Sequence, residues 1–404
     1  MTGIRIKPEL CLVCKGYRNL CGLPRCPILE RRLALSRVGR YINGHVDGSS
    51  PPSVVVGEVG YPVVKVMFNI PPNIHGINAA YYDDPSGWWG RLSLYDIIKL
   101  RSSMVAASMR IKVNETQALY DNELAPASVS EKPVDMEARL KGKLTGLSIN
   151  ELLVPTPPAA TALRINVSSD PKVPRVIDRL INDDAKASDA VWEAYKGGLS
   201  VYTLIRALSM GMLGERRRRR LVPTRWSITA VDSIIGGRLR GRVLSLPELS
   251  EELLFYGEYL GNRFIIMLRP GAYRARWIEV WYPSSALVTG KDAVIHVVDE
   301  DYGGRFSEMD GGFYAARLPI LEYLNKTGRT AEVVIFREVL PSYFVTVGNW
   351  HIRETVRRAL ENGPIGKGTE VHELLNRLLT YKGALRFMPS RISRITDYLG
   401  VEHG

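Results

Sequence analysis

The spacing of apolar residues changes several times along the chain, and each change predicts a different kind of element. Apolar residues at helical spacing predict helices over residues 92–99, 117–124, 134–140, 183–214 (a pair), 224–235, 310–325, 350–360 and 372–381. Runs rich in β-branched and aromatic residues predict strands over residues 54–56, 63–68, 104–113, 163–167, 263–269, 274–282, 293–298 and 332–337. Because these elements are not sorted into a regular alternation, the pattern predicts an α+β fold or irregular α/β packing.

Two of these regions carry more detail. We expect Thr224 to cap the helix over residues 224–235, and the pair Gly236-Gly237 to end it. Between residues 255 and 298, Gly/Pro turns separate successive strands. This arrangement predicts an antiparallel meander.

The cysteines are concentrated near the amino terminus. All four, namely Cys11, Cys14, Cys21 and Cys26, lie within sixteen residues. Thiolates are soft ligands, and four of them would close the tetrahedral shell of one metal ion, so the spacing predicts a structural Zn²⁺ site. An iron–sulfur cluster uses the same ligands, and disulfides are a third alternative in a hyperthermophile protein.

Loop-like composition around residues 43–53 and 143–158 suggests where the chain divides. The predicted segments are 1–42, a zinc knuckle with a basic helix; 43–158, a first α+β unit; 159–390, a main α+β unit that contains the meander; and 391–404, a carboxy-terminal tail.

Composition excludes a membrane protein and indicates a cytoplasmic one. The 404 residues are 45% hydrophobic and 24% charged, which is ordinary for a globular protein. We find no apolar run of about 18 residues and no signal-peptide pattern at the amino terminus. A single glutamine, Gln117, and 24 prolines are typical of a thermophile.

The net charge of +12 is concentrated in two segments. Residues 1–40 hold nine Arg and Lys against two acids, and residues 211–243 hold nine Arg against two acids. Concentrated basic charge favours a polyanion partner such as DNA. Solvated surface charge in a thermophile is the alternative.

The second basic segment supplies the candidate nucleic-acid-binding residues Arg216, Arg217, Arg218, Arg219, Arg220 and Arg225. Guanidinium groups match phosphate oxygens, and the helix amino terminus at Thr224 would add backbone donors. Such contacts set affinity without reading sequence. Farther along, arginines and aromatic residues interleave over residues 263–282, a pattern that suits stacking on unpaired bases but also suits a core strand.

An enzyme is the rival interpretation of the same region. Arg225, Ser227 and Thr229 could face a nucleotide phosphate. An enzyme's pocket would be formed by Arg225, Ser227 and Asp232, and His351 with Glu354 offers acid–base groups. The acidic residues of 299–310 offer oxygen ligands for Mg²⁺. Each set also has a purely structural interpretation, in which the side chains are packed and paired.

Two stretches carry a family resemblance. Residues 11–30 (CLVCKGYRNLCGLPRCPILE) and residues 222–232 (VPTRWSITAVD) resemble segments of the archaeal Nre family of DNA repair proteins. The resemblance implies a four-cysteine zinc site and a part in DNA damage repair. In part of the family it also implies a carboxy-terminal peptide that docks on the sliding clamp PCNA.

The carboxy terminus keeps part of a clamp-binding pattern. Ile395, Tyr398 and Leu399 have the spacing of its aliphatic and aromatic positions, and they share one face of a helical turn. The glutamine is missing, and leucine replaces the second aromatic residue. A terminal helix packed on its own domain is the alternative.

The leading hypothesis is therefore an archaeal repair protein that binds zinc and DNA and acts with PCNA. The alternatives are an enzyme acting on DNA or nucleotides, with its pocket around residues 225–232, and a protein-interaction scaffold whose basic segments meet acidic partners.

Overall fold

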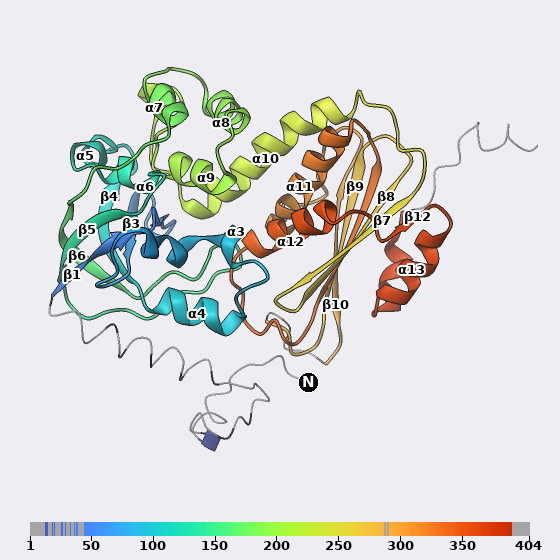
Figure 1. The fold of residues 1–404 in the computed structure, drawn as a ribbon, viewed down its shortest axis with the longest axis horizontal. Coiled ribbons are helices and arrows are strands. Elements are labelled where there is room, and N and C mark those ends of the chain that lie inside the picture. The colour runs from blue at the N-terminus through green and yellow to red at the C-terminus, as the bar shows by residue number, and fades with distance from the viewer. Residues whose placement is uncertain are drawn as a thin grey trace, which may run out of the picture.

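The computed structural model describes residues 44–286, 288 and 291–389, together with single positions between 13 and 38. Within these residues, two six-stranded sheets lie on either side of a group of helices (Figure 1). The predicted amino-terminal segment and the tail from residue 391 fall almost entirely outside the described residues.

The first sheet pairs its strands in the order β1-β5-β6-β4-β3-β2. Neighbouring strands are antiparallel, except that β4 and β6 run parallel, with Ala106 opposite Ala159. The strands are β1 (His45–Ser50), β2 (Val54–Val56), β3 (Val63–Ile70), β4 (Val105–Lys112), β5 (Val134–Lys141) and β6 (Ala159–Val167). The sheet therefore draws strands from both sides of the predicted boundary at residue 158.

Short helices connect the strands of this first half. They are η1 (Gly76–Asp83), α3 (Pro85–Trp88), α4 (Leu94–Ser102), α5 (Gln117–Asp121) and α6 (Leu124–Ser128). The best-formed start belongs to α4, where Ser93 and Asp96 make a reciprocal capping box. The predicted helix over residues 92–99 is confirmed.

The second sheet has the order β10-β9-β11-β8-β7-β12. Its strands are β7 (Leu253–Tyr259), β8 (Asn262–Arg269), β9 (Arg274–Trp281), β10 (Val294–Glu300), β11 (Glu332–Val339) and β12 (Gly366–Lys367). The predicted meander is wrong at its centre. The late strand β11 lies between β8 and β9, antiparallel to the first and parallel to the second. All eight residues of 332–339 are buried, so both faces of β11 are covered, as the middle position in the sheet requires.

Most of the remaining helices pack around α10 or against the second sheet. They are α7 (Arg175–Ile181), α8 (Ala187–Lys196), α9 (Val201–Ser209), η2 (Arg216–Arg218), α10 (Thr224–Val243), α11 (Gly311–Thr327), α12 (Trp350–Glu361), α13 (Glu370–Leu378) and η3 (Lys382–Phe387). Helix α10 packs on α9 and α11, and α11 packs on α12. Figure 1 shows α10 joining the helices of the two halves.

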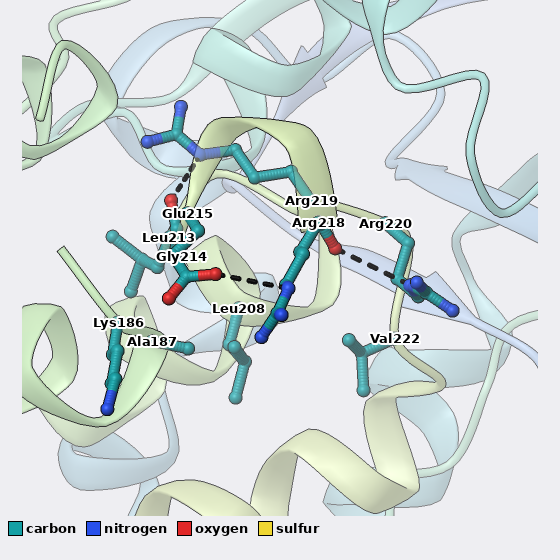
Figure 2. Close-up of a pocket in the computed structure, with 10 residues that line it drawn as sticks. All are labelled: Lys186, Ala187, Leu208, Leu213, Gly214, Glu215, Arg218, Arg219, Arg220 and Val222. Carbon is teal, nitrogen blue, oxygen red and sulfur yellow. Dashed lines mark hydrogen bonds and ion pairs between the residues drawn. The ribbon is translucent and has the colours of Figure 1, made fainter. Parts of the chain in front are cut away.

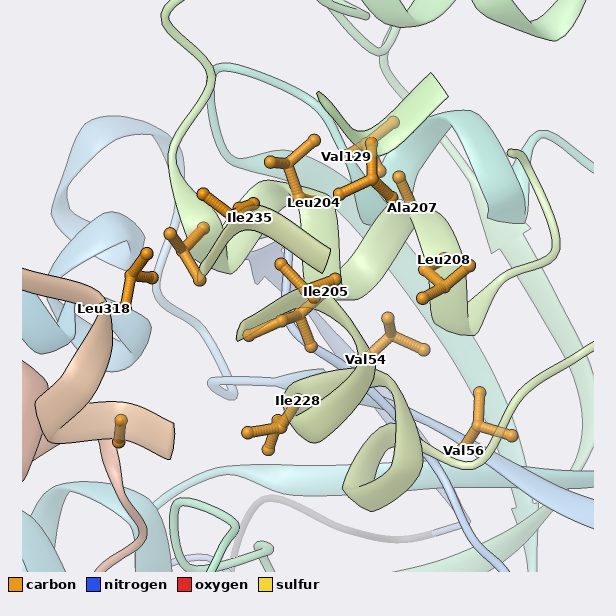
Figure 3. Close-up of a cluster of buried hydrophobic side chains, with 14 of the residues drawn as sticks. Val54, Val56, Val129, Leu204, Ile205, Ala207, Leu208, Ile228, Ile235 and Leu318 are labelled. Carbon is orange, nitrogen blue, oxygen red and sulfur yellow. The ribbon is translucent and has the colours of Figure 1, made fainter. Parts of the chain in front are cut away.

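A single hydrophobic cluster extends from the first sheet to the second. It contains Phe68 of β3 and Phe264 of β8. Figure 3 shows its middle, where Val54 of β2, Ile205 of α9 and Ile228 of α10 lie together. Burial of this common core ties the two halves together. The other face of the second sheet has a smaller core, which includes Ile265 and α13.

Residues 134–140 form strand β5 rather than the predicted helix. Val134, Met136, Ala138 and Leu140 are buried, whereas Glu137, Arg139 and Lys141 are exposed. This alternation has the period of two that a half-buried strand requires, so the period was misassigned.

Helix α10 also differs from its prediction, because it continues through Gly236 and Gly237 to Val243. The residue before the helix is Pro223, and the Thr224 hydroxyl instead accepts a hydrogen bond from the Val56 amide at 2.8 Å. Gly236 serves packing rather than termination. A Cβ at this position would lie 2.1 Å from Nη1 of the buried Arg317 on α11.

Two neighbouring glycine substitutions should therefore have opposite effects. Gly236→Ala is expected to lower the free energy of unfolding by about 1–3 kcal/mol, because the methyl group overpacks the α10–α11 contact. Gly237→Ala is the matched control. Its Cβ meets nothing within 4 Å, so better helix propensity should raise stability by up to about 1 kcal/mol. Equal effects in urea denaturation would contradict this account of Gly236.

Candidate nucleic-acid interface

The run of five arginines forms a short turn, residues 215–220, which we call the arginine turn. It follows α9, and its only regular element is η2. Backbone hydrogen bonds fix the segment that leaves it: the Leu221 amide donates to the Val113 carbonyl at 2.7 Å, and the Val222 amide donates to the Ser209 carbonyl at 3.0 Å. The arginine side chains therefore extend from a backbone segment that hydrogen bonds hold in place.

Arg219 points inward and is a structural residue. Its guanidinium donates to the carbonyls of Gly214, Leu180, Ile181 and Asp183 at 2.7–3.2 Å. The carbonyls of Leu180, Ile181 and Asp183 lie at and beyond the end of α7, where backbone acceptors lack helical partners. Partial burial lowers the pKa of Arg219. The sequence-based hypothesis treated all five arginines alike, and this one is committed to holding the turn on α7.

The other four arginines, Arg216, Arg217, Arg218 and Arg220, are exposed. Arg218 forms an ion pair with Glu215 at 3.2 Å, and the Arg220 guanidinium donates to the Arg218 carbonyl at 3.4 Å. Exposed ion pairs of this kind contribute little energy and are easily exchanged for another anion. The turn therefore presents four cations to solvent, with the carboxylates of Glu215 and Asp184 beside them.

A hollow of about 260 Å³ lies beside the turn. Figure 2 shows Lys186, Arg218 and Arg220 around an apolar floor of Leu208 and Val222. Lys186 is the residue immediately before α8, and no sequence motif indicated that it would lie beside the arginine turn. Cationic groups around a concave surface concentrate their field toward an anionic partner.

An exposed aromatic pair lies at the start of α10. The rings of Trp226 and Tyr61 are 5.6 Å apart between centroids, and the two residues are 49% and 43% exposed. Arg225 is next to Trp226 and forms an ion pair with Glu58 at 3.3 Å. Exposed rings beside arginine are a surface on which an unpaired base can stack. Tyr61 was not identified from sequence, since 165 positions separate it from Trp226.

The enzyme hypothesis assigned roles to Ser227 and Asp232, and both are buried. Asp232 accepts a hydrogen bond from Nη2 of Arg353 on α12 at 2.5 Å. Burial raises the pKa of Asp232, and the Arg353 guanidinium opposes this shift. The pair is a buried link between α10 and α12, while Arg225, in the first turn of the same helix, faces solvent.

The other two candidates lie in different surroundings. Glu354 accepts a hydrogen bond from the Tyr202 hydroxyl at 2.7 Å and pairs with Arg357 at 2.9 Å. His351 is 2.6 Å from the Gly348 carbonyl through Nδ1 and 3.4 Å from Arg337 through Nε2. Burial lowers the pKa of His351 to about 3, so the imidazole is neutral near pH 7. His351 faces a different cavity from the one around α10.

Comparison with known families matches two regions of the chain. Archaeal Nre, N-terminal, matches residues 20–287, and archaeal Nre, C-terminal, matches residues 300–389. The chain belongs to the archaeal Nre family.

Curated relatives agree with this assignment. The chain is 36% identical to DNA repair protein NreA of Archaeoglobus fulgidus, over 92% of each chain. It is 32% identical to DNA repair protein NreA of Haloferax volcanii over 78% of each, and 29% identical to DNA repair protein NreB of A. fulgidus over 86% of this chain and 87% of the relative. No solved structure shows a significant match.

Several predicted features of this Nre chain lie outside the described residues. Among the proposed zinc ligands, Cys14 is buried and Cys26 is partly buried, whereas Cys11 and Cys21 lie outside them. The proposed clamp-binding residues Ile395, Tyr398 and Leu399 also lie outside them. The zinc site and the clamp peptide stay predictions. None of the described helices combines the length and apolar character needed to cross a membrane.

The aromatic residues that interleave with arginines over residues 263–282 are in the core, whereas Arg263, Arg274 and Arg276 are partly exposed. Phe264, Tyr273 and Trp277 are fully buried. Base stacking on these strands is therefore excluded, and the core interpretation of the pattern is the correct one.

Proposed function

We propose that this Nre chain is an archaeal DNA repair protein of the cytoplasm that binds DNA through the arginine turn. The observation that carries the proposal is the exposure of Arg216, Arg217, Arg218 and Arg220 on an anchored turn. Lys186 adds a fifth cation at the rim of the adjacent hollow. Phosphate contacts of this kind give affinity and orientation without sequence preference.

The aromatic pair supports single-stranded or distorted DNA as the preferred partner. Tyr61 and Trp226 offer ring faces to an unpaired base, and Arg225 is placed for a neighbouring phosphate once it leaves Glu58. Stacking contributes about 1–3 kcal/mol per base and tolerates any sequence. A repair factor meets such unpaired bases at lesions and gaps.

DNA binding measured over a salt series tests the proposal, with single-stranded and duplex DNA compared. The plot of log affinity against log salt concentration is expected to have a slope of several units, because each neutralised phosphate contributes about 0.7–0.9. Weak, salt-independent binding would overturn the proposal. It would favour instead a scaffold that binds an acidic protein or an enzyme that binds a small nucleotide.

Zinc at the four cysteines is the second part of the proposal. Elemental analysis of protein without an affinity tag is expected to find one equivalent of zinc, since four thiolates hold the ion in a closed shell. Less than half an equivalent, together with reactive thiols, would reject the site. Iron and sulfide in place of zinc would indicate a cluster.

Clamp binding is the third part. The double change Tyr398→Ala and Leu399→Ala is expected to weaken PCNA binding at least tenfold, because both side chains would fill an apolar pocket of the clamp. Thr396→Ala, a change between the pattern positions, is the control. PCNA affinity equal to that of the parent would reject this peptide as the anchor.

A further inference from the structure

A second cavity lies at the far edge of the second sheet, away from the arginine turn. It has a volume of about 380 Å³ and is formed by β9, β10, the start of α11 and the residues that lead into α12. Its polar lining includes Glu279, His296, Asp310, Arg337, Asn349 and His351. The proposed DNA interface uses none of these residues.

Three potential metal ligands converge at the rim of this cavity. Nδ1 of His296 lies 4.0 Å from a carboxylate oxygen of Glu279 and 3.9 Å from one of Asp310. Metal–ligand bonds of about 2.0–2.2 Å place tetrahedral ligands about 3.4 Å apart. Small side-chain rotations would therefore bring the three ligand atoms within bonding distance of one ion. Among the described residues, these three form the group whose ligand atoms all lie within 4.8 Å of one another.

In each of the two carboxylates, one oxygen is fixed and the other is aimed at His296. Oδ1 of Asp310 caps α11 by accepting a hydrogen bond from the Phe313 amide at 2.6 Å, which leaves Oδ2 toward the histidine. Oε1 of Glu279 contacts the guanidinium of Arg337, Trp281 also forms a hydrogen bond with this carboxylate, and Oε2 is the oxygen that faces His296. The oxygens that face His296 are therefore held in place by the fold.

The imidazole of His296 is likewise held through one of its polar atoms, so that the other faces the proposed ligands. Its Nε2 contacts the carboxylate of Glu308, so the proton belongs on Nε2 and the lone pair on Nδ1. That lone pair faces Glu279 and Asp310. A carboxylate behind a histidine is the arrangement that fixes a metal-binding tautomer and raises the basicity of the ligand.

The charge balance of the cavity favours a cation. Glu279 is buried and pairs with Arg337, and Asp310 also faces His296. Arg337 balances one carboxylate, and Asp310 and Glu308 pair with no lysine or arginine among the described residues. A divalent ion between the ligands would neutralise both charges.

Asn349 is an independent sign of a ligand in the same cavity. It is 5% exposed, and its Nδ2 has no hydrogen-bond partner among the described residues. A Cβ added to Gly311 would lie 2.8 Å from that nitrogen, so the donor points toward the start of α11. A buried donor without a partner costs about 1–3 kcal/mol unless a ligand accepts from it.

We propose that Glu279, His296 and Asp310 bind a divalent transition-metal ion, and that Asn349 donates a hydrogen bond to an oxyanion bound at its open positions. Three protein ligands facing a cavity leave coordination positions open, as catalytic metal sites do. The mixture of imidazole and carboxylate suits Mn²⁺ or Zn²⁺. The oxyanion is of the phosphate class, for which the amino terminus of α11 is an additional donor.

Mn²⁺ binding to the full chain, stripped of metal, tests the first half of the proposal. Mn²⁺ is the probe because soft thiolates bind it poorly, so the cysteines do not interfere. We expect one equivalent to bind, as followed by loss of the electron paramagnetic resonance signal of the free ion. His296→Gln and Asp310→Asn should each weaken binding at least tenfold, and Glu308→Gln about 10–100-fold.

The variants are chosen to keep the fold. Asparagine is as good a helix cap as aspartate, so Asp310→Asn removes ligand charge but preserves α11. His372→Gln is the control, since His372 also lies 3.2 Å from a carboxylate, that of Glu252, outside the cavity. Failure of the parent to bind Mn²⁺, or equal affinity in the parent, His296→Gln and Asp310→Asn, would overturn the metal site.

Inorganic phosphate tests the second half. Bound Mn²⁺ should broaden the ³¹P resonance of phosphate added to the loaded parent, and Asn349→Ala should reduce that broadening severalfold while Mn²⁺ affinity stays within about twofold. Identical broadening in the variant would overturn the role of Asn349. DNA binding by the arginine turn is measured in a separate experiment. Failure of the metal or phosphate test therefore does not affect the proposed DNA interface, and the reverse also holds.

Discussion

Changing Arg216, Arg217, Arg218 and Arg220 together to serine is expected to lower DNA affinity by roughly 10²–10³-fold at about 100 mM salt. Each arginine that contacts a phosphate releases about 0.7–0.9 counterion. The slope of log affinity against log salt concentration should therefore also fall in magnitude by about 3. Fluorescence anisotropy over a salt series measures both quantities. The loss should be equal for all sequences, because phosphate contacts do not read bases.

Two features of this experiment distinguish the loss of charge at the arginine turn from a change in its structure. Arg219 is left in place, because its contacts with the end of α7 hold the turn. The control removes four exposed arginines elsewhere, Arg139, Arg164, Arg377 and Arg386, and so has the same net charge. An equal decrease in slope for both variants would indicate diffuse electrostatic attraction and contradict an interface at the arginine turn.

Asp232→Ala is expected to lower the free energy of unfolding by about 3–5 kcal/mol, the largest stability effect that we predict. The change leaves the Arg353 guanidinium, which is 1% exposed, without its carboxylate partner. An uncompensated charge in the core is costly because water cannot reach it. Urea denaturation followed by circular dichroism gives the measurement.

The double change Asp232→Leu and Arg353→Met is the control for this prediction. Replacing both partners with apolar residues of similar size is often neutral, so stability should return to within about 2 kcal/mol of the parent. A loss below about 1 kcal/mol for Asp232→Ala would contradict the structural role. It would revive the hypothesis of a nucleotide pocket around residues 225–232.

Local sequence patterns correctly predicted the elements whose capping residues and buried positions lie within the same short segment. The helix at residues 92–99 has its capping residues in sequence, and the strand at residues 104–113 has a buried run over residues 105–108 followed by an alternating stretch. Local patterns failed where distant contacts decide. Gly236 continues a helix because Arg317 of α11 packs against it, and β11 enters between β8 and β9 after a long helix.

The candidate sites show the same division. Sequence identified the arginine turn because charge density is a local property. It could not assign Arg219 to a structural role, since the carbonyls that bind its guanidinium lie 5–39 residues away. It noted Asp310 within an acidic stretch, but the convergence of Glu279 and His296 on that residue depends on the antiparallel pairing of β9 and β10.

The central position of β11 has a consequence for how the protein is made. Strands β8 and β9 belong to the region that matches the amino-terminal Nre family, whereas β11 belongs to the carboxy-terminal one. A nascent chain ending near residue 287 therefore has two unpaired strand edges, which are prone to misassociation. The second sheet can form completely only after residues 332–339 have left the ribosome, so the two family regions complete one sheet together and do not fold as separate units.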